Sequence, residues 1–326
     1  MTLHWIYRIG VVLLSAGLLA ACGGGDEGGD AGGGDQANGA SGQATTAEVA
    51  DASKAKRKCP PKVTTGQRAE GAPVDDIAGI RIGMSFDDVT WVLECRGDVP
   101  LIETAAKWNI QQDYGFPIRQ LVRATDGVPC TSQEILADMR SMGDGKCDNG
   151  GYSFKSLKDI GQQFAIVFTG MPGDEVAGAV WRRNGFTQGE NPTVESLSQS
   201  LAQKYGAPHD TETDRRGVTT LTWQYDLLGR PMSKATPAYR SCAQSFNPNF
   251  NAGQRWSSSC GLSLKAAITP VPGNELLAKQ LDVGVMHQKQ FYDAGQQFEA
   301  ALAAANEQRK REQAEEAASQ GAAPDL

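Results

Sequence analysis

The stretch Gly217-Val-Thr-Thr-Leu-Thr-Trp-Gln-Tyr225 decides the fold class, because its apolar and polar side chains alternate one by one. Its large apolar side chains fall on one side of an extended chain: Leu221, Trp223 and Tyr225. Residues 262–268 and 281–285 alternate in the same way. Such alternation is typical of an antiparallel sheet with one face in the core and one face in solvent. We expect the second half of the chain to form that sheet.

Helical patterns precede the strand patterns in both halves. Ser85 and Asp88 have the spacing of a capping box, and an apolar stripe follows them. We expect helices over residues 85–97, 132–142 and 193–205 and a long one from residue 288, with strands over 162–169 and 176–183. The chain therefore reads as a helix followed by strands, twice. This pattern predicts an α+β fold: an antiparallel sheet with packed helices, arranged as two tandem helix-plus-meander units, and a long C-terminal helix.

Composition shifts along the chain predict its organisation. Gly, Ala and Asp dominate the region before residue 73, which cannot bury enough apolar surface to fold. The final residues are rich in charge and are expected to fray. The predicted parts are a signal peptide (1–21), a disordered linker (22–72), two α+β units (73–190 and 191–305) and a charged, frayed tail (306–326).

Leu19-Ala20-Ala21-Cys22 closes an uncharged apolar stretch that follows Arg8, as in an export signal. The stretch is shorter than the roughly 20 residues that a spanning helix needs. It resembles the lipobox of bacterial lipoproteins. The resemblance implies cleavage after Ala21 and acylation of Cys22, which would anchor the chain through its acyl chains. Gly23, in place of an aspartate after the cysteine, implies the periplasmic face of the outer membrane.

Six cysteines remain once Cys22 is assigned to lipid. An even number in an oxidising compartment predicts disulfides, and the absence of Cys-x-x-Cys spacing argues against zinc. The sequence leaves the connectivity open. The simplest pairing joins cysteines that are near in sequence: Cys130 with Cys147, Cys242 with Cys260, and Cys59 with Cys95.

The charge and the motifs exclude several classes of function. A net charge of −7 argues against a nucleic-acid partner. The sequence contains no nucleophile elbow, no His-Glu-x-x-His and no P-loop. His209 and His287 are interpreted as surface or strand-end residues. We therefore expect no catalysis, no metal and no cofactor.

Two surfaces are candidates for binding a partner. The first is the segment between Cys242 and Cys260, because aromatic and arginine side chains dominate interface energetics. Its candidate partner-binding residues are Phe246, Phe250, Arg255 and Trp256. The alternative is that these rings pack under their own loop onto the sheet. The second surface is the polar side of the strands, which solvation alone could also explain: Thr220, Thr222, Gln224 and Lys265.

The segment Gly79-Ile-Arg-Ile-Gly-Met-Ser-Phe-Asp-Asp-Val89 resembles the entry to the first helix of SmpA/OmlA-type outer-membrane assembly lipoproteins. The helix-plus-meander pattern is similar to the tandem units of secreted β-lactamase inhibitor proteins. Both resemblances imply a fold more than a function. The expected function is a lipid-anchored, periplasm-facing protein that binds an envelope protein or a wall polymer. The alternatives are an envelope hydrolase or wall-modifying enzyme with an unfamiliar site, and an inhibitor of a periplasmic enzyme.

Overall fold

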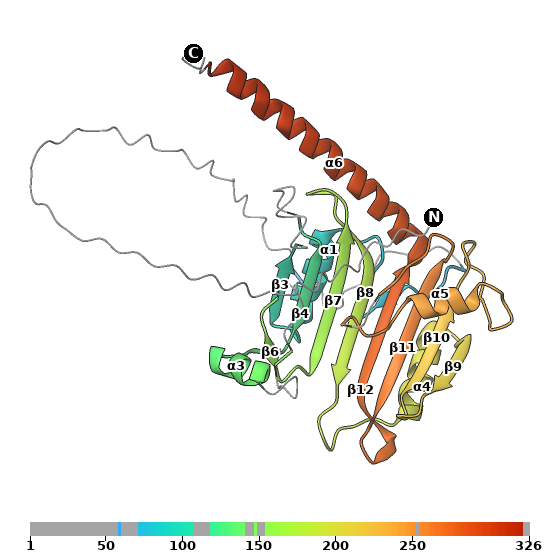
Figure 1. Ribbon diagram of the computed structural model, residues 1–326. Coiled ribbons are helices and arrows are strands. Elements are labelled where there is room, and N and C mark those ends of the chain that lie inside the picture. The colour runs from blue at the N-terminus through green and yellow to red at the C-terminus, as the bar shows by residue number, and fades with distance from the viewer. Residues whose placement is uncertain are drawn as a thin grey trace, which may run out of the picture. The chain divides into compact units, whose positions relative to one another are not determined.

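The protein is described by a computed structural model, which defines residues 58–59, 71–106, 118–140, 147–148, 154–251 and 254–321. The predicted signal peptide with Cys22, and nearly all of the predicted linker, lie outside these residues. The described residues form an eight-stranded antiparallel sheet, two small two-stranded sheets and five helices (Figure 1). The predicted α+β class is confirmed. No helix in the described ranges combines the length and the apolar character needed to cross a bilayer.

The first helix and the strands of the large sheet follow one another in the same order in both halves of the chain, and the first half has two further short strands beside its second helix. After the hairpin β1 (Asp76–Ile77) and β2 (Ile80–Arg81), the first half contains α1 (Phe86–Arg96), β3 (Leu101–Ala105), β4 (Leu121–Thr125), β5 (Val128–Pro129), α3 (Ser132–Arg140), β6 (Leu157–Lys158), β7 (Gln162–Thr169) and β8 (Val176–Gly185). The second half contains α4 (Val194–Tyr205), β9 (Asp210–Thr213), β10 (Thr219–Gln224), α5 (Tyr239–Ser245), β11 (Leu262–Val271), β12 (Asn274–His287) and α6 (Gln288–Ser319).

Each half is therefore a helix followed by four strands, with a helical insertion between the second and third strands. The strand order is β3-β4-β7-β8-β12-β11-β10-β9, so the last strands of the two halves pair and join them into one sheet. Each insertion is closed by a disulfide, Cys130–Cys147 in the first half and Cys242–Cys260 in the second. A third disulfide joins Cys59 to Cys95. These are the pairings expected from the sequence.

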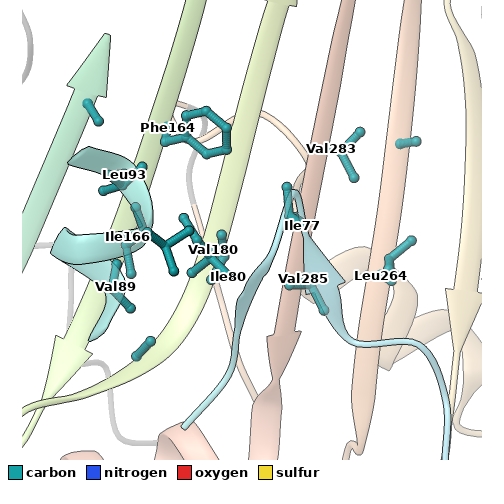
Figure 2. Close-up of a cluster of buried hydrophobic side chains, with 14 of the residues drawn as sticks. Ile77, Ile80, Val89, Leu93, Phe164, Ile166, Val180, Leu264, Val283 and Val285 are labelled. Carbon is teal, nitrogen blue, oxygen red and sulfur yellow. The ribbon is translucent and has the colours of Figure 1, made fainter. Parts of the chain in front are cut away.

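One face of the sheet, here called the helix face, carries the main apolar core. Ser85 caps α1 by accepting from the backbone N of Asp88 at 3.2 Å, and Gly97 ends the helix in the left-handed region at φ 73°. The helices α1 and α4 pack their apolar stripes onto this face, together with the β1–β2 hairpin. Figure 2 shows buried side chains of this core from the hairpin, α1 and four strands: Ile77, Ile80, Val89, Leu93, Phe164, Ile166, Val180, Leu264, Val283 and Val285.

The opposite face, here called the loop face, differs from the expected solvent-exposed face. Its polar side chains are largely buried: Gln224 is 0% exposed, Ser263 1% and Asp282 5%. The start of α6 and the segment Cys242–Cys260 lie over this face and cover them. The buried polar groups are tolerated because they hydrogen-bond to one another and to the covering segments.

The last helix is longer than expected. The charged segment predicted to fray is helical as far as Ser319, and this part of α6 extends past the sheet (Figure 1). Side-chain pairs one turn apart support it: Gln308 donates to Glu312 at 2.8 Å, and Arg311 lies 3.5 Å from Glu307. Because α6 is already nucleated where Phe298 and Leu302 pack, extending it adds residues without a new nucleation step.

A buried carboxylate fixes the start of α1 to the sheet. Burial alone would raise the pKa of Glu175, but hydrogen bonds from Arg119 and from the backbone N of Gly173 outweigh it, and the pKa is lowered. Arg119 donates to both carboxylate oxygens, at 2.9 and 2.6 Å. The backbone O of Glu175 also accepts from the backbone N of Phe86 at 3.0 Å. The pair therefore ties the β7–β8 turn to the first residue of α1.

This pair predicts a pH dependence of stability. Because the folded-state pKa of Glu175 lies below its unfolded value, its contribution is present at neutral pH and is lost as the pH falls through the folded value. We expect Arg119→Gln to lower the free energy of unfolding at pH 7 by about 1 kcal/mol, since Arg119 is 36% exposed and solvent screens its charge. Urea unfolding of both proteins between pH 7 and pH 3 measures this. Stability curves that stay parallel down to pH 3 would contradict it.

Candidate functional site

The segment Cys242–Cys260, here called the stapled loop, packs its aromatic rings onto the loop face. Phe246 is 1% exposed and its ring centre lies 5.6 Å from that of Trp181 on β8. Phe250 meets the same indole edge-on at 5.3 Å. Trp256 contacts Phe291 of α6 at 4.8 Å. The loop, β8 and the start of α6 therefore contribute rings to one aromatic cluster.

Two glycines in the sheet make room for these rings. A Cβ at Gly284 would lie 2.7 Å from the Trp181 ring and 2.8 Å from the Phe246 ring. A Cβ at Gly178 would lie 2.2 Å from the Phe291 ring. Real Cβ atoms do not approach that closely, so any other residue at either position would push a ring away. The sheet is thus shaped to receive the loop and the helix.

Hydrogen bonds fix the turn of the loop on β8. The Trp181 Nε1 donates to the backbone O of Asn247 at 2.9 Å. Arg183 donates through Nη2 to Asn249 Oδ1 and through Nε to Asp282 Oδ1, both at 2.9 Å. One strand therefore holds the loop through its backbone and through a charged side chain.

Gln288, the first residue of α6, ties together the loop, the helix and β11. It is 0% exposed. Its Nε2 donates to the backbone O of Cys242 at 2.9 Å and to Ser263 Oγ at 2.7 Å, while its Oε1 accepts from Ser257 N at 3.1 Å. Both ends of the stapled loop are thus fixed to the helix start.

The four aromatic and arginine candidates therefore differ in how far their side chains are exposed. Phe246 is buried, and Phe250 and Trp256 are half-buried against the sheet and α6. Arg255 alone among the four is exposed. The alternative that the rings pack under their own loop describes this arrangement, and a role of these residues in binding stays a prediction.

The part of the loop face beyond the stapled loop is more open. The strand register places small and polar side chains of β9 to β12 side by side there. We call this surface the open strip; its residues are Glu212, Val218, Thr220, Lys265, Ala267, Thr269 and Gln280. A shallow hollow lies at its outer end, lined by Glu212, Asp214 and Thr220 among others. Of the four polar candidates, Thr220 and Lys265 belong to the open strip, whereas Thr222 and Gln224 are buried.

Charged groups border the open strip. Lys234 lies 2.9 Å from Asp210 and 2.8 Å from Glu212, and the Tyr239 hydroxyl donates to Asp210 at 3.0 Å. Burial lowers the pKa of the Lys265 ammonium. That ammonium makes no hydrogen bond or ion pair with other residues that the structure describes. Sequence reasoning missed the Lys234 bridge, because the lysine follows β10 in an irregular segment and no spacing rule links it to β9.

Both histidine side chains hydrogen-bond to nearby backbone groups. His209 Nδ1 lies 2.8 Å from the backbone O and 3.0 Å from the backbone N of Gln224, and its ring packs edge-on against Tyr225. His287 caps α6. Burial lowers the pKa of both rings, which favours the neutral imidazole. Within the described part of the chain, no three His, Cys, Asp or Glu side chains are grouped to hold a metal ion.

Comparison of the chain with protein-family models, with curated proteins and with solved structures finds no match in any of the three.

Proposed function

We propose that the chain is a lipid-anchored, periplasm-facing protein that binds an envelope protein or a wall polymer through the open strip and does not catalyse a reaction. The Cys22 motif supports the anchor and the location. The loop face supports the binding role, since it offers an accessible sheet surface beside a segment that is fixed in place.

The observation that carries the binding role is the rigidity of the border around the open strip. The stapled loop is held by a buried disulfide, by the aromatic cluster and by Gln288. A surface that is already ordered loses little conformational entropy when it binds. The small side chains of Thr220 and Ala267 also leave the sheet backbone close to a partner. These features suit a partner that lies flat on the strands.

An inhibitor of a periplasmic enzyme would be expected to present an exposed aromatic loop, but the rings of the stapled loop pack against the sheet and α6 here. A hydrolase that uses histidine as its acid or base would need a ring free for proton transfer, but both His209 and His287 are engaged in backbone hydrogen bonds. These placements favour binding over either alternative.

The test is photocrosslinking in intact cells with the full-length chain. A photoreactive amino acid is placed at Thr220, which lies in the open strip, or at Thr211, which is exposed but lies on the helix face. We expect a crosslinked species from position 220 and none from position 211. Identical crosslinks at the two positions, or none at 220, would contradict the proposal. Cys22→Ser is expected to move the chain from the membrane fraction to the soluble periplasmic fraction.

A further inference from the structure

Two arginines stack on one buried phenylalanine at the helix face. Phe164 on β7 is 0% exposed. The guanidinium carbon of Arg96, the last residue of α1, lies 4.9 Å from its ring centre, and that of Arg182 on β8 lies 5.3 Å away. Stacking on an aromatic ring orients a guanidinium and suits its weakly hydrated faces. The ring thus brings two positive charges together from different elements.

The two arginines differ in their partners. Arg96 donates to both oxygens of Asp98, at 3.0 and 2.6 Å. Arg182 donates through Nη2 to the amide oxygen of Gln162, and the amide group of Gln162 in turn donates to Asp98. Its Nε is buried without a partner in the described chain. Its Nη1 also makes no hydrogen bond there, but unlike Nε it is not fully buried.

Comparison with the other buried or half-buried arginines of the fold shows that Arg182 lacks a carboxylate partner. Five of them hold a carboxylate through charged hydrogen bonds: Arg81 with Asp75, Arg96 with Asp98, Arg119 with Glu175, Arg123 with Glu103 and Arg183 with Asp282. Arg182 has a neutral amide in that place. The cluster of Arg96, Asp98 and Arg182 therefore carries two positive charges and one negative charge.

An unpaired charge in this setting is unfavourable. Removing a guanidinium from water is costly unless a counter-charge replaces the lost hydration. Burial lowers the pKa of Arg182, and the neighbouring charge of Arg96 lowers it further. Asp98 attracts Arg182, but both of its oxygens already accept from Arg96. An additional anion would relieve both the desolvation and the repulsion.

We propose that Arg182 and Arg96 form a binding site for one anionic oxygen group, a carboxylate or a phosphate. The group binds at the free Nη1 of Arg182, where the exposed Asp98 marks the solvent side of the cluster. Charge-assisted hydrogen bonds from the guanidinium over Phe164 provide the affinity and the orientation. The site lies on the helix face, so it does not depend on the open strip or on its partner.

The test uses the full chain with Cys22→Ser, labelled with ¹⁵N so that the arginine Nε–H signals can be followed by NMR. Sodium phosphate or sodium acetate is added at constant ionic strength, balanced with sodium chloride. We expect the Nε–H signals of Arg182 and Arg96 to shift and to saturate with one of the two anions. Saturation with phosphate identifies a phosphate site, and saturation with acetate identifies a carboxylate site.

Two variants separate specific binding from general charge effects. In the parent chain, the anion is also expected to raise the thermal midpoint of unfolding. Arg182→Gln is expected to abolish both this rise and the saturable shift of the Arg96 signal. Arg240→Gln removes an exposed arginine and is expected to retain both. Should Arg182→Gln not fold, Arg182→Lys keeps the charge but loses the planar fork, and is expected to weaken binding severalfold. No saturable shift with either anion, or equal responses in all variants, would overturn the proposal.

Discussion

Gly284→Ala is expected to lower the free energy of unfolding by about 2 to 3 kcal/mol, as overpacking of a dense core does. The new Cβ would lie 2.7 Å from the Trp181 ring and 2.8 Å from the Phe246 ring. Trp181 cannot turn aside without breaking its hydrogen bond to Asn247. Phe246 would therefore have to move, and with it the stapled loop. Urea unfolding followed by tryptophan fluorescence measures the loss.

Gly295→Ala is the matched control, because it adds the same methyl group where nothing lies within 4 Å. Gly295 is inside α6, where alanine favours the helix by roughly 0.5 to 1 kcal/mol. We expect this variant to be more stable than the parent, so the two substitutions have effects of opposite sign. A Gly284→Ala protein as stable as the parent would show that the aromatic cluster is loosely packed, and the argument for a rigid border of the open strip would fail.

Sequence patterns predicted five of the eight strands of the large sheet, β7, β8, β10, β11 and β12, because each of these carries its own evidence, whereas β3, β4 and β9 were not predicted. The alternation around Trp223 identifies β10 without reference to any neighbour, and the Ser85 cap locates the start of α1 within the chain. The disulfides could likewise be predicted, because each joins cysteines that are near in sequence. These features depend on nearby residues, so a single sequence contains them.

The same alternation could not predict what covers the polar side of the strands. The sequence predicts that Gln224 and Ser263 face solvent, because polar side chains on the side of a strand away from the core are normally exposed. They are buried because Gln288 begins α6 at this point and the stapled loop folds back over β8. That outcome depends on contacts between distant segments. The sequence accordingly identified the loop-face candidates but not which of them remain accessible.

The anion site was also beyond sequence reasoning. Arg96 and Arg182 are far apart in the chain, and each looks like an ordinary charge at a helix end or on a strand. The register of β7 and β8 places Arg182 directly opposite Phe164, and the end of α1 brings in Arg96. Arg182 is notable because it lacks a carboxylate that comparable arginines have, and partners are visible only in three dimensions.

Removing the Cys242–Cys260 disulfide is expected to have the largest effect of any change discussed above. Closing a loop of this length stabilises a fold by about 3 kcal/mol in the chain-entropy model. Both cysteines are also 0% exposed and pack with Met232 and Tyr239. Replacing both with alanine therefore leaves a small cavity as well, and we expect a total loss of about 4 kcal/mol. Urea unfolding of the double variant measures it.

The Cys130–Cys147 disulfide is a natural control, because the two bridges have sequence separations of 18 and 17 residues. Chain entropy alone predicts equal losses for the two alanine double variants. The structure predicts unequal ones, since α3 buries no residue, whereas Cys242 and Cys260 are buried and their loop packs in the aromatic cluster. We expect the Cys130–Cys147 variant to lose at least about 1 kcal/mol less than the other. Equal losses would mean that both bridges act on the unfolded chain alone, and that the stapled loop owes nothing to its packing on the loop face.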